Sequence, residues 1–327
     1  MPSTHTHALI AEEVLAALPE NVRAQIVSEK EYFAGAQGAD VYFFLRFCAD
    51  TEKNVGKSLH RRGIYKSFSA LLDAAREGDA AVRSYAAGYI THYAADTVFH
   101  PFVYGTQEKL AAARAAGERA LRRVSLHSYI ESDLDAHFLS ERGKEGRTER
   151  TALSSGAAEK LYPAVRAAYG GTPFTPRAFR RSFRRFALYE RVFSNARPRR
   201  RKVFRALETV CFAPHVCSVL CRRQTPDPRC VNAAREQWRN PSDPAFTSHE
   251  SADELFARAV REGVRLVCAF FIALEGNGEL AEADFSKNYL TGAAEGVPLV
   301  RPGQRERRAR KIKGGVRDDA EQPRDAE

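Results

Sequence analysis

The sequence lacks any long apolar segment. Among its 327 residues, the longest uninterrupted apolar run extends from Leu266 to Leu274 and has nine residues. A helix that crosses a bilayer needs about 20, so no transmembrane segment is predicted. The N-terminus begins Met-Pro-Ser-Thr-His-Thr-His, without a basic region followed by an apolar stretch. We therefore expect no secretory signal and a cytoplasmic location, with peripheral contact at the inner membrane surface as an alternative.

Cysteine is scarce as well. Six cysteines in a chain of this length, without an expected export signal, predict reduced thiols rather than a disulfide framework. Four of them lie between Cys211 and Cys230, close to His215, and a zinc site is one interpretation of that group. The pairs 211/215 and 217/221 fall on different faces of a continuous helix. We therefore favour buried free thiols there.

Sustained alternation of apolar and polar residues, the pattern of strands, is also missing. Apolar residues recur instead at helical spacing, first over residues 9–18 and then in seven longer segments. These segments are 56–77, 79–104, 111–140, 152–169, 176–195, 202–222 and 251–274. The sequence predicts an all-α protein: a single multi-helix bundle over residues 1–300, followed by a charged, disordered tail at 301–327.

Positive charge is abundant, but only in one segment. The net charge is +10, and residues 177–205 contain twelve Lys or Arg and one acid, so the rest of the chain is nearly neutral. Three phenylalanines lie at i, i+4 and i+7 in this segment, and the arginines around them include Arg180, Arg184, Arg199, Arg200 and Arg201. The segment can contact an anionic membrane surface, which we favour over nucleic acid. Alternatively, the phenylalanines pack inward and the arginines are merely solvated.

Histidines and carboxylates occur together at helical spacing. His92, Asp96 and His100 lie at i, i+4 and i+8, so each step turns about 40° and all three share one helix face. His127 and Glu131 repeat the i, i+4 spacing. Imidazole and carboxylate ligands without a nearby thiolate favour zinc or another first-row ion in a catalytic site. For any single pair, an ordinary surface contact or a hydrogen-bonded core histidine is the alternative.

These motifs, together with others before them, resemble the bacterial branch of the zinc-dependent phospholipase C family. In chain order they are Thr6-His7, Gly35-Ala36-Gln37-Gly38-Ala39-Asp40 followed by aromatic residues, His60, the helix from His92 to His100-Pro101, and the pair His127 and Glu131. The resemblance covers roughly residues 1–135. Two later motifs are also similar, Trp238-Arg239-Asn240-Pro241 and Asn288-Tyr289-Leu290-Thr291-Gly292.

The resemblance implies an all-α enzyme with two or three zinc ions. It implies one centre at Asp40, His60, His92 and Asp96, a second at His100, His127 and Glu131, and a third that shares Asp96 and takes His7. The secreted enzymes complete the third centre with an N-terminal tryptophan, which this sequence does not have. They also place five residues between the bridging aspartate and the next histidine, where this chain has three. His5 is an alternative ligand for the third ion, and a dinuclear site remains the other interpretation.

The implied activity is hydrolysis of a phosphodiester bond in a phospholipid. Three zinc ions and three carboxylates leave an excess of positive charge, which attracts a phosphate ester. Asp40 is the expected general base for the attacking water, and Asp133 and Asp135 are candidates for orienting a ligating imidazole. Two alternatives remain: a zinc-dependent nuclease or phosphomonoesterase, and a non-catalytic helical protein that binds metal.

Overall fold

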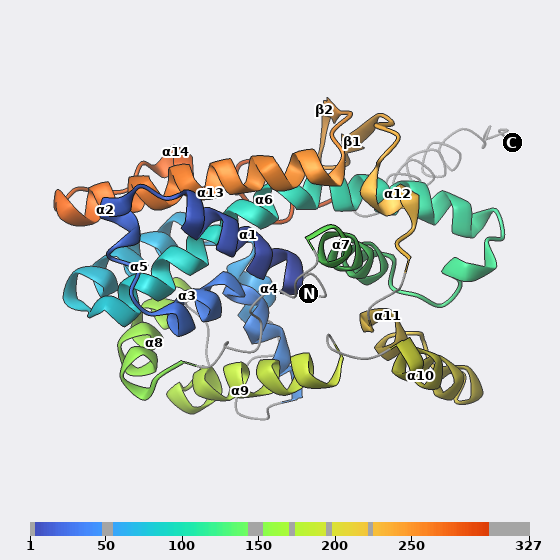
Figure 1. The fold of residues 1–327 in the computed structure, drawn as a ribbon, viewed down its shortest axis with the longest axis horizontal. Coiled ribbons are helices and arrows are strands. Elements are labelled where there is room, and N and C mark those ends of the chain that lie inside the picture. The colour runs from blue at the N-terminus through green and yellow to red at the C-terminus, as the bar shows by residue number, and fades with distance from the viewer. Residues whose placement is uncertain are drawn as a thin grey trace, which may run out of the picture.

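One long central helix organises the structure. The computed structural model describes residues 4–47, 55–142, 153–169, 174–193, 198–221 and 225–300. Helix α6 (Ala80–Ala115) runs through the middle, and α1 (Thr4–Ala17), α3 (Glu29–Ala36), α7 (Leu126–Arg142) and α13 (Ala252–Glu275) pack against it (Figure 1). The expected all-α fold is confirmed.

The other elements surround this core (Figure 1). The remaining helices are α2 (Glu20–Arg23), η1 (Gly38–Phe47), α4 (Val55–Leu59), α5 (Ile64–Glu77), η2 (Arg119–Leu121), α8 (Ser155–Tyr169), α9 (Pro176–Val192), α10 (Pro198–Val210), α11 (Cys217–Leu220), α12 (Pro228–Val231) and α14 (Glu282–Phe285). Strands β1 (Trp238–Asn240) and β2 (Asp243–Ser248) form a two-stranded antiparallel sheet. Within the described residues, no helix has the length and hydropathy of a membrane span.

Two helix starts follow directly from capping residues. The Asp79 carboxylate accepts hydrogen bonds from the backbone N–H groups of Ala81 and Val82 at the start of α6. Ser251 and Glu254 form a reciprocal capping box at the start of α13. Such caps satisfy N–H groups that have no partner in the first turn. The predicted segments beginning at 79 and 251 match these two starts.

Three segments that were each predicted as one helix are divided in the structure. The segment 56–77 is divided into α4 and α5 at Gly63, whose φ is +63°. The segment 202–222 is divided into α10 and α11, and Phe212 after α10 has φ +51°. A residue in this left-handed region ends a right-handed helix. The segment 111–140 is divided because α6 extends to Ala115 and α7 begins only at Leu126.

Helix α6 continues through Pro101 and ends at Ala115, eleven residues beyond the predicted segment 79–104. A proline in a helix leaves the carbonyl four residues earlier without its usual hydrogen bond. That carbonyl belongs to Thr97, and it faces Gly292, where an added Cβ would lie 2.6 Å from the Thr97 oxygen. Gly292 therefore lets the chain of the second C-terminal motif pack closely against α6 at this point.

Two glycines bring α3 and α6 close together. A Cβ added at Gly35 would lie 2.2 Å from the Tyr85 carbonyl oxygen, and one at Gly88 would lie 1.9 Å from that of Tyr32. Neither helix could keep its position with a larger residue there, because the clashing atoms are backbone. The close approach places the end of α3, and the Gly38–Asp40 turn after it, beside the middle of α6.

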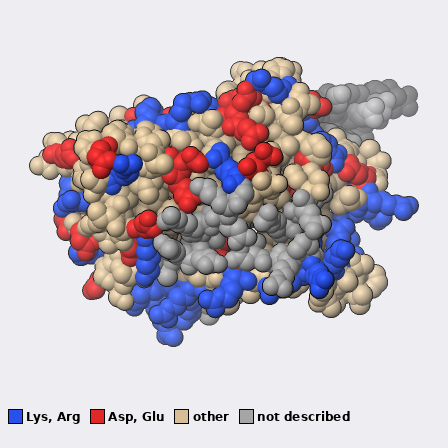
Figure 2. All heavy atoms as spheres, viewed as in Figure 1, with Lys and Arg blue, Asp and Glu red and all other residues tan. Residues whose placement is uncertain are grey.

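The three regularly spaced phenylalanines of the basic segment lie inside the protein. Phe179, Phe183 and Phe186 on α9 are buried, whereas Arg180 and Arg184 are exposed. The interpretation in which the phenylalanines pack inward is therefore the correct one for α9. Figure 2 shows Lys and Arg side chains gathered along the lower edge of the view, where Figure 1 places α9.

The five cysteines in the described part of the chain are free thiols. Cys221 and Cys230 are buried as expected, but Cys211 is exposed. None of the five belongs to a potential metal-binding group among the described residues. Cys48 and the expected tail at 301–327 lie outside the described residues.

Candidate metal centre

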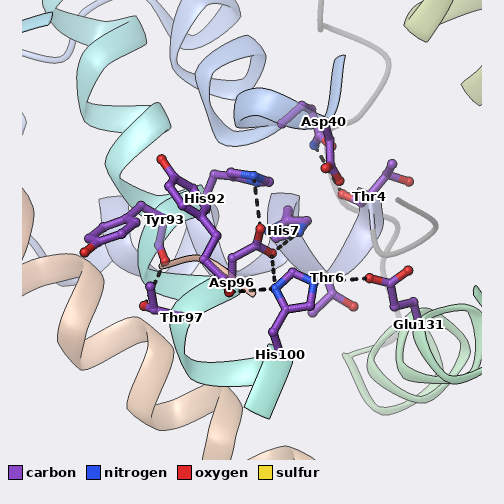
Figure 3. Close-up of polar contacts among 12 residues, drawn as sticks. Thr4, Thr6, His7, Asp40, His92, Tyr93, Asp96, Thr97, His100 and Glu131 are labelled. Carbon is purple, nitrogen blue, oxygen red and sulfur yellow. Dashed lines mark hydrogen bonds and ion pairs between the residues drawn. The ribbon is translucent and has the colours of Figure 1, made fainter. Parts of the chain in front are cut away.

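The buried face of α6 presents His92, Asp96 and His100 toward α1 and α7, as Figure 3 shows. Asp96 lies at the middle of this arrangement. Its Oδ1 is 3.4 Å from His7 Nε2, and its Oδ2 is 3.4 Å from the Nε2 atoms of both His60 and His92. Three segments of the chain thus meet at one carboxylate: α1, the residues between α4 and α5, and α6. His100, on the next turn of α6, also has its Nδ1 3.6 Å from Oδ1.

Three groups of potential ligands surround this point. They are Asp40 with His60 and His92, His7 with His92 and Asp96, and His100 with His127 and Glu131, and the potential ligand atoms within each group lie within 4.8 Å of one another. The structure therefore brings together all eight residues named as ligands from the sequence. His92 belongs to two groups, although an imidazole offers one ligand atom.

Backbone carbonyls orient two of the imidazoles. His60 Nδ1 lies 2.7 Å from the Gly56 carbonyl oxygen, and His100 Nδ1 lies 2.9 Å from that of Tyr289. A carbonyl can only accept, so each Nδ1 carries the proton and donates it. The Nε2 atoms are left facing carboxylates, Asp40 for His60 at 3.2 Å and Glu131 for His100 at 3.8 Å. This is the usual way in which a histidine is prepared to ligate a metal.

The Tyr289 carbonyl comes from the second C-terminal motif, residues 288–292, whose role was not evident from the sequence. The first of these motifs supports it, because the Asn240 side-chain amide donates to the Thr291 carbonyl oxygen at 2.7 Å. Trp238 packs against Phe102 on α6, with 5.4 Å between the ring centroids. Both motifs therefore hold the chain that orients His100.

Asp40 lies in the 3₁₀ helix η1, where its backbone N–H donates to the Gln37 carbonyl oxygen. It therefore lies within a helical turn rather than in an open loop. Gly38, two positions earlier, has φ +51°, and a Cβ there would lie 2.0 Å from Cδ2 of His92. The glycine thus allows Asp40 and His92 to approach each other.

The expectation that Asp133 and Asp135 orient a ligating imidazole was wrong. Asp135 accepts hydrogen bonds from the Thr6 N–H at 2.8 Å and the Thr6 hydroxyl at 2.6 Å. Asp133 accepts one from the Asp227 N–H at 2.8 Å. Both are buried rather than solvated. Asp135 satisfies the N-terminal turn of α1, and it thereby positions the helix that carries His7.

His5 is buried in the first turn of α1 but belongs to none of the three groups found among the described residues. It precedes His7 by two positions, so the two side chains leave the helix about 200° apart. The geometry does not bring the His5 ring to the same face as His7.

The surroundings lower the pKa values of two carboxyl groups and of two imidazoles in this centre. Burial alone would raise the pKa of Asp96, but the imidazoles of His100, His92 and His60 hold it well below its usual range. Burial likewise opposes ionisation of Glu131, yet the neighbouring His127 lowers its pKa to about 2. Burial lowers the pKa of His92 to about 3 and also lowers that of His100. Carboxylate and neutral imidazole are the forms that coordinate metals.

Several buried polar atoms in this centre have no hydrogen-bond partner among the described residues. They are both ring nitrogens of His92 and Nδ1 of His7 and of His127. A buried polar atom without a hydrogen bond destabilises the folded state, so such atoms are rare in proteins unless a ligand contacts them. A cavity of about 10 Å³ lies between α1, α6 and α7, lined by His7, Asp96, His100 and Glu131 among others. The nitrogen and oxygen donors at this position fit zinc.

Zinc binding is predicted to release a proton from His60. Burial opposes protonation of this ring, but hydrogen bonds to Asp40 and Asp96 raise its pKa to about 10 in the metal-free protein. Below that pH zinc must displace the proton, so apparent affinity should fall as the pH is lowered, by up to about tenfold per unit. Calorimetric titration at pH 8 in buffers of different ionisation enthalpy measures the release. The His60→Gln variant should release one proton fewer than the wild type when zinc binds. The control variant His137→Gln, at a residue outside the three ligand groups, should release as many protons as the wild type. Heats that are equal in all buffers would contradict this prediction.

The fold and the site together define an all-α protein with a buried histidine–carboxylate centre suited to zinc. The chain matches the zinc-dependent phospholipase C family over residues 6–171, just over half of its length. The chain belongs to this family, and the resemblance drawn from its motifs is confirmed. All eight expected ligands lie inside the matched segment. No curated protein and no solved structure matches the chain.

Proposed function

We propose that the protein is a zinc-dependent hydrolase that cleaves a phosphodiester bond in a phospholipid, as phospholipase C does. The observation that carries this proposal is the meeting of three histidine–carboxylate groups at Asp96, inside the segment that matches the family. A site with this donor set, in a family of this activity, supports phosphoester hydrolysis over other reactions of a zinc protein.

Each group of ligands has a role in the proposal. Asp40, His60, His92 and Asp96 would hold one zinc ion, and His100, His127 and Glu131 a second. His7 and Asp96 would hold a third. Bound zinc supplies a Lewis acid for the phosphate oxygens and lowers the pKa of a coordinated water. The residues of the chain contribute only three carboxylates, so the loaded site has a positive excess that favours an anionic substrate.

Asp40 is the residue that we assign as proton acceptor. Burial would raise the pKa of its carboxyl, but the hydrogen bond from His60 and the nearby His92 keep it well below its usual range. The carboxylate is therefore available as a base at neutral pH. Its position on η1, across from the ligands of α6, places it at the border of the centre rather than at its middle (Figure 3).

Asp40→Asn should abolish hydrolysis while leaving the fold and most of the zinc in place. The amide keeps the shape of the side chain and removes the charge that accepts the proton, a contribution of roughly 10²- to 10⁴-fold in rate. The ligands on α6 and α7 remain and should retain at least one pair of ions. Turnover of a chromogenic phosphodiester is measured beside zinc content and thermal unfolding. An unchanged rate with unchanged zinc would remove Asp40 from the mechanism.

A panel of substrates separates the proposed activity from its alternatives. Release of a phosphorylated headgroup from phospholipid supports the proposal. Faster cleavage of single-stranded nucleic acid, or of phosphate monoesters, would identify a nuclease or a phosphomonoesterase instead. Stoichiometric zinc without hydrolysis of any phosphoester would identify a non-catalytic metal protein.

The lipid substrate also implies peripheral contact with an anionic membrane, which we propose for the basic segment 177–205.

A further inference from the structure

Helix α10 and the turn after it expose an unusual set of large apolar side chains. The exposed fractions are 57% for Val203, 56% for Leu207, 75% for Val210, 82% for Phe212 and 51% for Val216. Exposed single residues are normal on a protein surface, but five in a stretch of fourteen residues form a patch. Figure 2 shows uncharged surface at the lower right of the view, where Figure 1 places α10.

The apolar residues of α10 form one stripe. At about 100° per residue, Val203, Leu207 and Val210 lie within an arc of roughly 60°. Glu208, which is buried, points about 100° or more away from this arc. Arg199 and Arg200 are exposed and lie about 20° outside the two edges of the stripe, and the exposed Lys202 lies about 80° from it. An apolar stripe bordered by arginines is the arrangement of helices that lie in a membrane interface.

The stripe is held in a fixed orientation. Glu208 caps α11 by accepting the N–H groups of Val216 at 2.9 Å and of Cys217 at 2.6 Å. Arg201 donates to the Cys221 carbonyl oxygen at 2.8 Å, which joins the start of α10 to the end of α11. The two helices therefore form one hairpin, and the residues on its outer face cannot turn inward without breaking these bonds.

This hairpin is attached to the helix that carries two of the expected zinc ligands. The His215 N–H donates to the Arg123 carbonyl oxygen at 2.8 Å, just before α7, and Arg123 donates to the Phe212 carbonyl oxygen. Helix α11 packs against α7, which carries His127 and Glu131. A surface that binds α10 is thus anchored through α11 to one wall of the metal centre.

We infer that the outer face of α10, with Phe212 and Val216, docks on an anionic lipid bilayer. We call this face the docking stripe. The charge around it is positive, which attracts anionic headgroups, and its aliphatic residues gain by entering the acyl boundary. A nucleic acid would match the charge but would leave the aliphatic stripe in water. The inference deepens the proposed function, on which it rests, because it locates the contact with the lipid surface on α10 and places the buried phenylalanines of α9 outside it.

Vesicle flotation tests the docking stripe. The wild-type protein should bind vesicles of phosphatidylcholine with about a third phosphatidylglycerol, bind pure phosphatidylcholine weakly, and lose binding in high salt. Val203→Glu with Leu207→Glu should reduce binding to the anionic vesicles by at least about tenfold. Val27→Glu with Ile272→Glu is the matched control, because these side chains are 67% and 71% exposed and lie elsewhere. The control should bind as the wild type does.

Four outcomes would overturn the inference. They are equal binding by both double variants, no vesicle binding by the wild type, binding of single-stranded DNA in place of vesicles, and a concentration-dependent dimer that the Val203/Leu207 variant abolishes while vesicles stay unbound. Hydrolysis of a soluble short-chain phosphodiester by the wild type is measured separately. Hydrolysis without vesicle binding would contradict the docking stripe alone, and vesicle binding without hydrolysis would contradict the proposed function alone.

Discussion

Asp96→Asn is expected to leave at most one zinc ion bound and to lower phosphodiester hydrolysis by at least about 10³-fold. Asp96 is the residue on which the histidines from α1, α4–α5 and α6 converge, with oxygen–nitrogen distances of 3.4 Å to His7, His60 and His92. An amide removes the negative charge between them and offers one oxygen instead of two. Two of the three centres share this carboxylate, so both should weaken together. Zinc content and turnover are measured on the same preparation.

Asp133→Asn is the matched control for this substitution. Asp133 is fully buried on α7 and accepts a backbone hydrogen bond, but it is in none of the three groups found in the described part of the chain. This variant should lose some stability and keep its zinc and its activity. Full zinc content and full turnover in the Asp96→Asn variant would contradict the role of Asp96 as a shared zinc ligand that hydrolysis requires.

Gly38→Ala is expected to destabilise the protein by about 2–4 kcal/mol and to remove zinc from the group of Asp40, His60 and His92. Its φ is +51°, which an alanine adopts only with strain. The new methyl would also lie 2.0 Å from the His92 ring, so the ring would have to leave its position. The free energy of unfolding from urea titration and the zinc content measure the two effects.

Gly117→Ala separates strain from steric clash. Gly117 also has a positive φ, of +102°, but no atom lies within 4 Å of where its Cβ would be. This control should cost only the backbone strain, about 1–2 kcal/mol, and should keep its zinc. Equal zinc loss in both variants, or none in either, would contradict the proposed steric link between Gly38 and His92.

The sequence predicted best what depends on neighbouring residues. The i, i+4 spacing of His92, Asp96 and His100 requires only that α6 be a helix, and the pair His127 and Glu131 requires only α7. His92, Asp96 and His100 are buried because other helices pack around the middle of α6. The convergence of His7, Asp40 and His60 on Asp96 is different, since it joins segments distant in sequence. Only the family resemblance indicated it.

Features that depend on packing between distant segments could not be predicted. Pro101 disfavours a continuous helix, but α6 continues through it, and Gly292 packs beside Pro101 and the Thr97 carbonyl. The capping of α1 by Asp135 joins residues about 130 positions apart. The breaks at Gly63 and Phe212 depend on backbone angles that tertiary contacts select. Local propensity is a weak guide wherever such contacts decide.

The basic segment also combines a feature that the sequence predicted with one that depends on packing. Charge alone indicated that residues 177–205 contact an anionic surface, but it did not distinguish α9 from α10. The structure buries Phe179, Phe183 and Phe186, while it exposes Val203 and Leu207. Which apolar residues face the solvent is set by the hairpin of α10 with α11, and no periodicity within α10 shows which of its faces that hairpin covers.

A crystallographic measurement of anomalous scattering at the zinc edge tests the central claim most directly, because it counts the ions and identifies their ligands together. The account predicts three peaks. One lies between Asp40, His60, His92 and Asp96, one between His100, His127 and Glu131, and one beside His7 and Asp96, with ligand distances of about 2.0–2.2 Å. Absence of the third peak alone would define a dinuclear site. Crystals grown with zinc that show no peak at these residues would contradict the account.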